Sequence, residues 1–153
     1  MGSREASSDM IILLVEDDEG HAKLIMRALG GVEVPQKIFW VSDGKEALDY
    51  LFHHGQYGDK NKSPRPDLVI LDLRLPKRDG QEVLKTIKHS ANLKGIPVVV
   101  ITSSKNKEDE MEAYSNYANS YLLKPSDFHD FSGLIEEAGS YWLIRNHQER
   151  VGM

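Results

Sequence analysis

Residues 66–80, PDLVILDLRLPKRDG, place a carboxylate directly after a short apolar run and end on an Asp-Gly pair. The run LVIL at residues 68–71 is continuous in Val, Ile and Leu instead of alternating with polar residues, which is typical of a strand buried on both faces of a parallel sheet. Beyond Gly80, apolar residues recur at helical spacing through residue 89. The segment therefore predicts one strand, loop and helix of an α/β domain, with Asp72 where the strand ends.

The same unit recurs along the rest of the chain. Apolar runs at residues 11–15, 37–41, 97–101 and 121–123 are each followed by a helical pattern, at residues 19–29, 44–54, 107–117 and 127–144. Strands that alternate with helices in this way form a parallel sheet, with right-handed connections that place helices on both faces. We therefore expect a doubly wound five-stranded parallel sheet, with residues 55–66 as a surface insertion before the third strand.

Composition places the chain among ordinary soluble globular proteins. Its 153 residues suit one domain with a substantial core, and its formal net charge of −5 argues against a general binder of nucleic acids or anionic membranes. The chain has no cysteine, which excludes disulfides, thiolate metal sites and cysteine nucleophiles. The apolar runs are too short to span a bilayer, and the N-terminus lacks the apolar core of a signal peptide, so we expect a cytoplasmic protein.

Domain organisation follows from the same pattern. We expect an N-terminal tail over residues 1–9, part of which is typical of an expression-vector remnant, and a C-terminal tail over residues 146–153. Between them we expect a single domain over residues 10–145, with no output domain after the last helix.

Acidic, hydroxyl and amine side chains come directly after four of the predicted strands. Glu16 and Asp17 follow the first strand, Asp72 the third, Thr102 the fourth and Lys124 the fifth. In a doubly wound sheet, ligands bind beyond the carboxyl ends of the strands, so we expect these side chains to converge at one edge. Clustered carboxylates either protonate or recruit a cation, and oxygen ligands without His or Cys favour a hard divalent ion, Mg²⁺ before Ca²⁺.

Because Mg²⁺ readily shares phosphate oxygens, this edge is expected to handle phosphate. Asp72 would then be the nucleophile, since a carboxylate can form an acyl phosphate. Lys124 would neutralise one phosphoryl oxygen as a point charge, and the Thr102 hydroxyl would hydrogen-bond another.

Taken together, these segments resemble the receiver domain of two-component response regulators. The similar segments are ILLVED at residues 12–17, LVILDLRLPKRDG at 68–80, PVVVIT at 97–102 and YLLKP at 121–125, in the family's order and at the same strand ends. The resemblance covers roughly residues 10–145. It implies the flavodoxin-like receiver fold, with strand order 2-1-3-4-5.

The resemblance also implies a role for each residue of the site. Asp72 is the expected phosphoacceptor, Asp17 the direct Mg²⁺ ligand, and Glu16 the residue that orients the water molecules on the metal. The backbone carbonyl of Arg74 would complete the protein's metal ligands, and Lys124 would precede a cis peptide bond to proline.

Thr102 and Tyr121 are the switch residues that the resemblance implies. After phosphorylation the hydroxyl moves toward the phosphoryl group and the aromatic ring turns inward, which biases an existing two-state equilibrium. The reshaped face would comprise the fourth helix, the fifth strand and the fifth helix, at residues 107–117, 121–123 and 127–144.

Three features make the chain most similar to the small regulators that pair with phytochrome-type sensor histidine kinases. They are the insertion at residues 55–66, the LPKRDG run at residues 75–80 and the Tyr141-Trp142-Leu143 segment. The similarity implies a sensor histidine kinase as partner and a homodimer through the switch face. It implies neither catalysis on external substrates nor direct contact with nucleic acid or membrane, and the downstream protein is not indicated.

Several of these residues have plainer alternatives. Asp18 suits an N-cap of the first helix as well as a peripheral metal role, and Asp79 before Gly80 is typical of a helix cap. Thr102 can simply end a strand, and an aromatic residue such as Tyr121 often only packs in a core. The six histidines lie on predicted helices or helix ends and make poor chelates.

Two other functions use a similar strand-end aspartate. An aspartyl phosphatase of the haloacid-dehalogenase type carries a second Asp two residues later as general acid, whereas this chain has Arg74 there. A degenerate receiver that only scaffolds a partner would be expected to lack Asp72 or Lys124, and both are present. The sequence therefore favours a phosphorylation-dependent signalling domain.

Overall fold

Five strands alternate with helices in the computed structural model, which describes residues 9–75 and 79–147. The expected tails lie almost entirely outside these residues, as does Pro76 of the loop after Asp72. The strands are β1 (Met10–Val15), β2 (Gln36–Val41), β3 (Leu68–Leu71), β4 (Val98–Thr102) and β5 (Ser120–Leu123). The helices are α2 (Glu19–Leu29), α3 (Gly44–Phe52), α4 (Gly80–Lys88), α5 (Lys107–Ser115) and α6 (Phe128–Gly139). None of the described helices combines the length and the apolar content that a bilayer crossing requires.

The strands form one parallel sheet in the order β2-β1-β3-β4-β5. This confirms both the doubly wound class and the strand order that the resemblance implied. Because β1 and β3 pair directly, with Val15 opposite Leu71, the residues that follow these two strands leave the sheet at the same edge.

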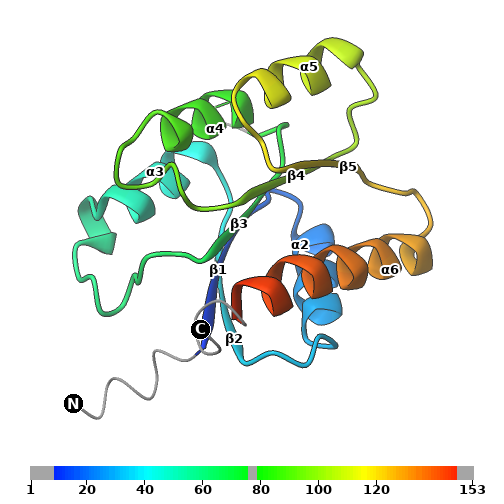
Figure 1. The fold of residues 1–153 in the computed structure, drawn as a ribbon, viewed down its shortest axis with the longest axis horizontal. Helices are drawn as coiled ribbons and strands as arrows, with labels where there is room; N and C mark the ends of the chain where they lie inside the picture. The colour runs from blue at the N-terminus through cyan, green and yellow to red at the C-terminus, as the bar shows by residue number, and fades with distance from the viewer. Residues whose placement is uncertain (1–8, 76–78, 148–153) are drawn as a thin grey trace.

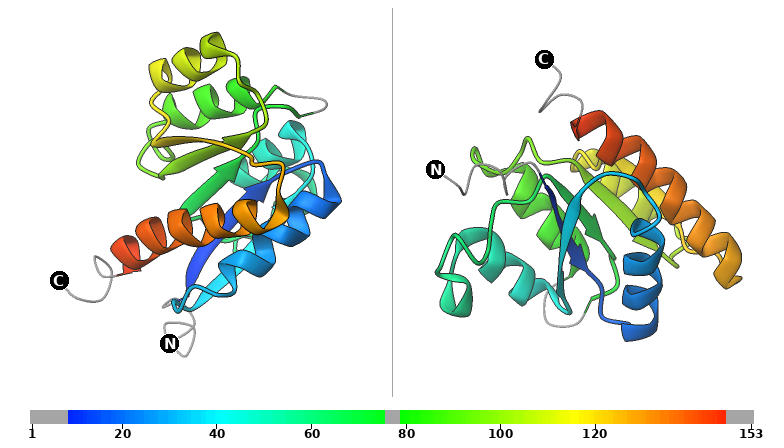
Figure 2. Two further views of the ribbon diagram at one scale, coloured as in Figure 1. Left: turned by 90° about the vertical axis from the view of Figure 1, so that its right-hand side faces the viewer. Right: turned by 90° about the horizontal axis from the view of Figure 1, so that it is seen from below.

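Helices cover both faces of the sheet. Figures 1 and 2 show α3, α4 and α5 on one face and α2 and α6 on the other. Side chains alternate along the strands accordingly: Leu13 and Val15 pack in the core with α3, α4 and α5, whereas Ile12 and Leu14 pack with α2 and α6. The central strands are therefore buried on both faces, which explains why their sequences are continuously apolar.

A polar side chain caps the start of each described α-helix. Each capping side chain accepts a hydrogen bond from a backbone N–H of the first turn, which satisfies a donor that has no partner within the helix. The capping residues are Asp18, Asp43, Asp79, Asn106 and Asp127. The capping role considered for Asp18 and expected for Asp79 is therefore confirmed.

Three expectations differ from the structure in detail. The insertion at residues 55–66 is not entirely irregular, because Gly55–Tyr57 forms a 3-10 turn, and the last helix continues beyond Gly139 as a π-helical turn, Ser140–Ile144. The described residues contain no cis peptide bond, so the cis bond expected after Lys124 is wrong. Proline only reduces the preference for the trans form to about 0.5–1 kcal/mol, so it permits a cis bond without requiring one.

Gly139 lets the end of α6 approach α2 closely. A Cβ atom on Gly139 would lie 2.7 Å from Leu29 Cδ2 and 3.4 Å from Val32 Cγ2. Gly133, in the same helix, is exposed and would place its Cβ in open space. Comparing an alanine substitution at each glycine therefore separates the effect of helix propensity from the effect of packing.

We expect Gly139→Ala to leave the protein about 1–3 kcal/mol less stable than Gly133→Ala, the usual cost of inserting a methyl group into a packed contact. Both substitutions gain about 1 kcal/mol of helix propensity, so the difference isolates the contact between α2 and α6. Urea denaturation followed by circular dichroism measures both free energies of unfolding. Equal stabilities would show that Leu29 gives way without cost.

Candidate functional site

Three carboxylates meet at the carboxyl edge of the sheet. Glu16 and Asp17 follow β1 and Asp72 follows β3, and one oxygen from each side chain lies within 4.8 Å of the others. Glu16 and Asp72 are buried, at 1% and 5% exposure, whereas Asp17 is exposed. The structure thus brings together the acidic residues that the sequence placed at one edge.

Lys124 reaches into this cluster from the end of β5. Its backbone N–H donates to the Thr102 carbonyl oxygen at 2.8 Å, which extends the pairing of β4 and β5 by one residue. Its Nζ lies 2.8 Å from Glu16 Oε1 and 2.8 Å from Asp72 Oδ2, and its side chain is only 6% exposed. Desolvating such charges is costly, so removing one partner would leave an uncompensated buried charge.

The charges in this cluster shift one another's pKa. Burial raises the pKa of Glu16 to about 7; the hydrogen bond from Lys124 opposes that rise and the charge of Asp72 adds to it. Burial lowers the pKa of Lys124, but its hydrogen bonds to Asp72 and Glu16 outweigh burial and leave the pKa raised. Lys124 therefore remains a cation at neutral pH, while Glu16 is divided between its two forms.

Backbone and indole N–H groups hold this part of the site in place. Asp72 Oδ1 accepts a hydrogen bond from the backbone N–H of Arg74 at 2.9 Å, and Glu16 Oε2 accepts one from that of Asp18 at 3.1 Å. Trp40 of β2 donates its indole N–H to the carbonyl oxygen of Glu16 at 2.7 Å. Both buried carboxylates are therefore oriented by the protein itself.

Gly80 makes room for the chain around Asp72. A Cβ atom on Gly80 would lie 2.5 Å from the Asp72 carbonyl oxygen and 2.5 Å from Leu73 Cα, closer than real side chains come. The backbone N–H of Gly80 donates to the Leu73 carbonyl oxygen at 3.1 Å. This close approach of α4 explains why glycine follows Asp79.

The set of donors suits a hard divalent cation. All three side chains of the cluster offer carboxylate oxygens, which Mg²⁺ prefers, and no imidazole belongs to the cluster in the described part of the chain. Lys124 supplies a single positive charge against Glu16, Asp17 and Asp72, so further positive charge would be favourable. The carbonyl of Arg74 as an additional ligand remains a prediction.

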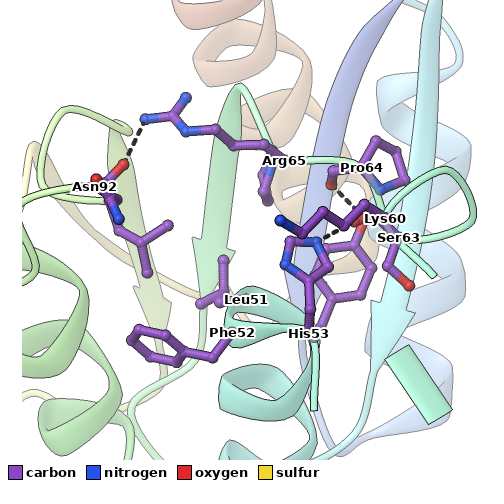
Figure 3. A pocket seen from close by; sticks show the side chains of 11 residues that line it. Leu51, Phe52, His53, Lys60, Ser63, Pro64, Arg65 and Asn92 are labelled. Carbon is purple, nitrogen blue, oxygen red and sulfur yellow. Dashed lines mark hydrogen bonds between the residues drawn. The ribbon is translucent and has the colours of Figure 1, made fainter. Parts of the chain in front are cut away.

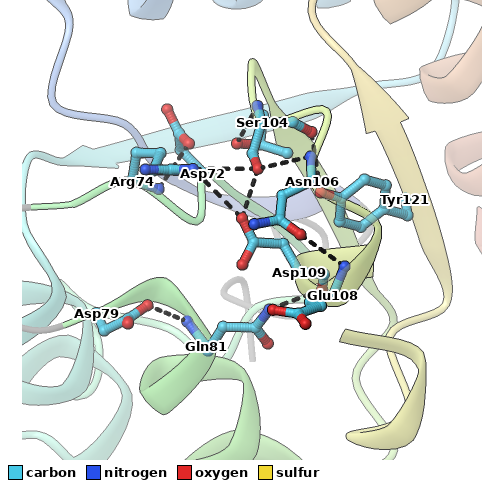
Figure 4. A network of polar contacts seen from close by, with 10 residues as sticks. Asp72, Arg74, Asp79, Gln81, Ser104, Asn106, Glu108, Asp109 and Tyr121 are labelled. Atoms are coloured by element: carbon cyan, nitrogen blue, oxygen red, sulfur yellow. Dashed lines mark hydrogen bonds and ion pairs between the residues drawn. The ribbon is translucent and has the colours of Figure 1, made fainter. Parts of the chain in front are cut away.

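Both predicted switch residues contact Ser104 in the loop after β4; Figure 4 shows Ser104 and Tyr121. The backbone N–H of Ser104 donates to Thr102 Oγ1 at 3.2 Å, and the Tyr121 hydroxyl donates to the Ser104 carbonyl oxygen at 3.2 Å. Thr102 is fully buried. Thr102 and Tyr121 are therefore linked through one residue.

The side chain of Ser104 is held by a polar network from three further segments (Figure 4). Ser104 Oγ donates to Asp109 Oδ2 at 2.5 Å, and Arg74 Nη2 lies 3.2 Å from Ser104 Oγ and 3.4 Å from Asp109 Oδ2. The backbone N–H of Asn106 donates to Ser104 Oγ at 3.3 Å, and Gln81 Nε2 of α4 donates to the Asp109 carbonyl oxygen at 2.8 Å. The network joins the loops after β3 and β4 to the start of α5.

No role at this site was predicted for Ser104, Asp109 or His21. His21 Nδ1 lies 3.0 Å from Lys124 Nζ, and its ring packs edge-on against Phe131 with centroids 5.4 Å apart. The contact of His21 with Lys124 joins residues 103 positions apart, and that of Arg74 with Ser104 joins residues 30 apart. No local spacing signals such contacts; the position of Ser104 two residues beyond the strand-end Thr102 was the only hint.

Comparison with known proteins agrees with this geometry. The family model described as the response regulator receiver domain matches residues 12–136, a range that contains every residue of the carboxylate cluster and of the network around Ser104.

Individual relatives match over most of the chain. The chain is 52% identical over 139 residues to a probable methanogenesis regulatory protein, FilR2, of Methanothrix harundinacea (91% of this chain and 87% of that protein). It is 38% identical over 141 residues to the response regulator Rcp1 of a Synechocystis species (92% and 94%). The crystal structure of Mn²⁺-bound Rcp1 matches at a TM-score of 0.83 with 39% identity, over 88% of this chain and 94% of that one. The phosphorylated cyanobacterial phytochrome response regulator RcpA matches at 0.84 with the same identity and coverage.

The raised pKa of Glu16 predicts a pH-dependent stability for the metal-free protein. Because the pKa rises from 4.5 to about 7 on folding, the folded chain binds this proton more tightly than the unfolded chain does. The resulting stabilisation is complete below about pH 4.5 and is lost as the pH rises through about 7. From this group alone, we expect the free energy of unfolding in EDTA to fall by up to about 3 kcal/mol as the pH rises from about 4.5 to 8.

Glu16→Gln cannot titrate, so its free energy of unfolding should decline less between pH 5 and pH 8 in urea denaturation. Glu19→Gln is the matched control, because Glu19 is exposed on α2 and pairs only with Lys23 at 2.9 Å among the described residues. It should keep the wild-type slope. A slope that Glu16→Gln leaves unchanged would contradict the assignment.

Proposed function

This chain belongs to the response regulator receiver domain family, and on that premise we propose that Asp72 accepts a phosphoryl group from a sensor histidine kinase. Members of this family act in two-component signalling as phosphorylated proteins, as RcpA illustrates. The proposal depends above all on the convergence of Asp72 with Glu16, Asp17 and Lys124 at one edge of the sheet.

Asp72 is suited to in-line attack because its carboxylate is buried and held by the protein. Oδ1 is hydrogen-bonded to the backbone N–H of Arg74 and Oδ2 to Lys124. In the transfer, a carboxylate oxygen of Asp72 forms a bond to phosphorus while the phosphorus–nitrogen bond to the kinase histidine breaks. The histidine nitrogen keeps the electron pair and takes up a proton, and Asp72 becomes an acyl phosphate. The protein would thus catalyse only its own modification.

We assign the metal to Glu16, Asp17 and Asp72, with the backbone carbonyl of Arg74 as a further ligand. Asp17, the exposed member, would bind the metal directly, whereas Glu16, already bonded to Lys124, would orient its water molecules. When bound, Mg²⁺ would neutralise negative charge that develops on the phosphoryl oxygens. The Mn²⁺-bound structure of Rcp1 supports a divalent ion in this family.

Lys124 and Thr102 would stabilise the phosphorylated state. The ammonium group of Lys124, already 2.8 Å from Asp72, would neutralise a phosphoryl oxygen while it keeps its contact with Glu16. The Thr102 hydroxyl would leave the N–H of Ser104 and donate to another phosphoryl oxygen.

Movement of Thr102 would disturb Tyr121, because both contact Ser104. We propose that the surface reshaped in this way comprises α5, β5 and α6, which corresponds to the face expected from the resemblance. It carries the exposed ring of Tyr114 on α5 and that of Tyr117 just before β5, at 48% and 70% exposure. Large exposed rings favour contact with another protein. We propose that the partner at this surface is a second copy of the chain.

For the phosphoryl donor we propose a phytochrome-type sensor histidine kinase. The support is the similarity to RcpA, a phytochrome response regulator, over 88% of this chain. The higher identity to FilR2, a probable methanogenesis regulatory protein, makes a kinase without a phytochrome sensor the alternative. Phosphotransfer from purified kinases of both kinds distinguishes the two.

We expect incubation with acetyl phosphate and Mg²⁺ to add one phosphoryl group to the chain and Asp72→Asn to abolish the addition. Intact-protein mass spectrometry detects it, and the product should be stable in acid and labile in base. Asp79→Asn should be labelled like the wild type, because Asp79 caps α4 and lies outside the carboxylate cluster. Asp17→Asn should still be labelled, but at a higher Mg²⁺ concentration. Full labelling of Asp72→Asn would exclude Asp72 as the acceptor.

Ser104→Ala should loosen the unphosphorylated arrangement of the switch. The substitution removes the hydroxyl that joins Arg74 and Asp109 but keeps the backbone groups that contact Thr102 and Tyr121. We expect the amide NMR shifts of β5 and α5 to move toward those of beryllofluoride-treated wild-type protein.

Ser103→Ala is the matched control for this experiment, because Ser103 is the exposed neighbour of Ser104 in the same loop. Its amide shifts should stay at the untreated positions. If the shifts of Ser104→Ala depart from the line that joins the two wild-type states, the network does not govern the switch.

A further inference from the structure

A pocket lies at the opposite edge of the sheet from the carboxylate cluster. It lies between the end of α3, the insertion before β3 and the turn before β4 (Figure 3), and its volume is about 270 Å³. Segments that precede β3 and β4 are at the amino ends of these strands, whereas Asp72 follows β3 at its carboxyl end. A ligand in this pocket would therefore not compete for space with phosphoryl transfer.

Side-chain hydrogen bonds join the three segments that form the pocket. The Tyr50 hydroxyl of α3 donates to the Pro64 carbonyl oxygen at 2.8 Å. Arg65 Nη2 donates to the Asn92 carbonyl oxygen at 3.0 Å, which connects the insertion to the turn before β4 (Figure 3). The hollow is thus formed by the chain before any ligand arrives, which reduces the entropic cost of binding.

Apolar side chains supply much of the lining. Leu51 and Leu93 are almost buried, at 5% and 6% exposure, whereas Phe52 is 39% exposed. Figure 3 shows Leu51 between Phe52 and the Arg65 side chain. An apolar group seated here would be removed from water together with the exposed part of Phe52.

The charge of the pocket differs from that of the whole chain. Lys60 and Arg65 line it and none of the described lining residues is acidic, although the chain carries a formal net charge of −5. The nearest acidic residues in the sequence bond to backbone groups instead: Asp59 of the insertion accepts from an N–H of its own loop at 2.9 Å, and Asp67, which follows the insertion, accepts from an N–H of β1 at 2.8 Å. The positive charge of the pocket is therefore not neutralised from within its lining.

We propose that this pocket binds a small organic anion with an apolar body, in the class of aromatic or branched-chain carboxylates. The apolar body lies on Leu51, Phe52 and Leu93, and the carboxylate faces Lys60 and Arg65. A guanidinium group offers five N–H donors, so the hydrogen bond from Arg65 to the backbone leaves donors for a carboxylate.

The dimensions favour a small molecule over a protein segment. The volume of about 270 Å³ lies just below the range of about 300–1,000 Å³ that small-molecule pockets typically occupy, so the ligand would be small. Such pockets are typically apolar with a few polar groups, and this lining contains residues of both kinds. A stable protein interface typically covers about 800 Å² on each partner, far more than a pocket of this size can supply.

The test uses phenylacetate as the probe and phenylacetamide, which has the same ring without the charge, as its control. Titration into the ¹⁵N-labelled, unphosphorylated full chain in EDTA should shift the backbone amides of residues 50–53, 60–63, 65 and 92–93 in a saturable way. We expect phenylacetate to bind about three- to tenfold more tightly than phenylacetamide. Asp72→Asn should bind phenylacetate like the wild type, so the outcome is independent of the proposed phosphorylation.

Two lysines of the insertion provide a matched pair of variants. Lys60 lines the pocket, whereas Lys62 is exposed on the same loop and is outside the lining. Lys60→Gln should weaken phenylacetate about two- to fivefold without affecting phenylacetamide, and Lys62→Gln should change neither. Absence of saturable shifts at the named residues, equal affinities for acid and amide, or equal losses in the two variants would overturn the proposal.

Discussion

The ammonium group of Lys124 allows three carboxylates to share one edge of the sheet. It lies 2.8 Å from both Glu16 and Asp72, in surroundings that exclude most water. Without that cation the two buried carboxylates and the neighbouring Asp17 would repel one another, and burial alone would disfavour their charged forms. Even with it, the pKa of Glu16 is raised to about 7. Lys124 therefore holds the carboxylates together but does not balance their negative charge, and the remaining negative charge favours binding of a divalent cation.

The topology of the sheet creates both this crowding and its connection to the surface. Strands β1 and β3 are neighbours, so the acidic residues after them meet, and Lys124 reaches them from the end of β5, beyond β4. Tyr121 lies in β5, the strand that directly precedes Lys124. Its hydroxyl contacts Ser104, which also contacts Thr102. Asp72 contacts Arg74, Arg74 contacts Ser104, and Ser104 contacts both Asp109 of α5 and Tyr121 of β5; the switch that we propose would use these contacts.

The carboxylate cluster and the pocket carry opposite charge. The carboxyl edge gathers Glu16, Asp17 and Asp72 around a single lysine, whereas the pocket at the amino edge gathers Lys60 and Arg65 without an acidic residue among its described lining. The 4 residues of β3 alone span about 13 Å at about 3.3 Å per residue. That span exceeds the Debye length of about 8 Å at physiological ionic strength, so ions at the two edges would scarcely affect each other.

Hydrophobic periodicity was enough to predict the sheet and its helices, because burial on both faces makes a strand continuously apolar and strand direction brings residues such as Asp17 and Asp72 to one edge. The network of Ser104 and Asp109 and the trans bond after Lys124 could not be predicted, since they depend on how separate loops pack. The linear pattern establishes which groups stand at the strand ends. Only the tertiary structure shows that Lys124 is buried between Glu16 and Asp72. The distances between these groups and their removal from water depend on how distant segments pack, and no local sequence pattern indicates them.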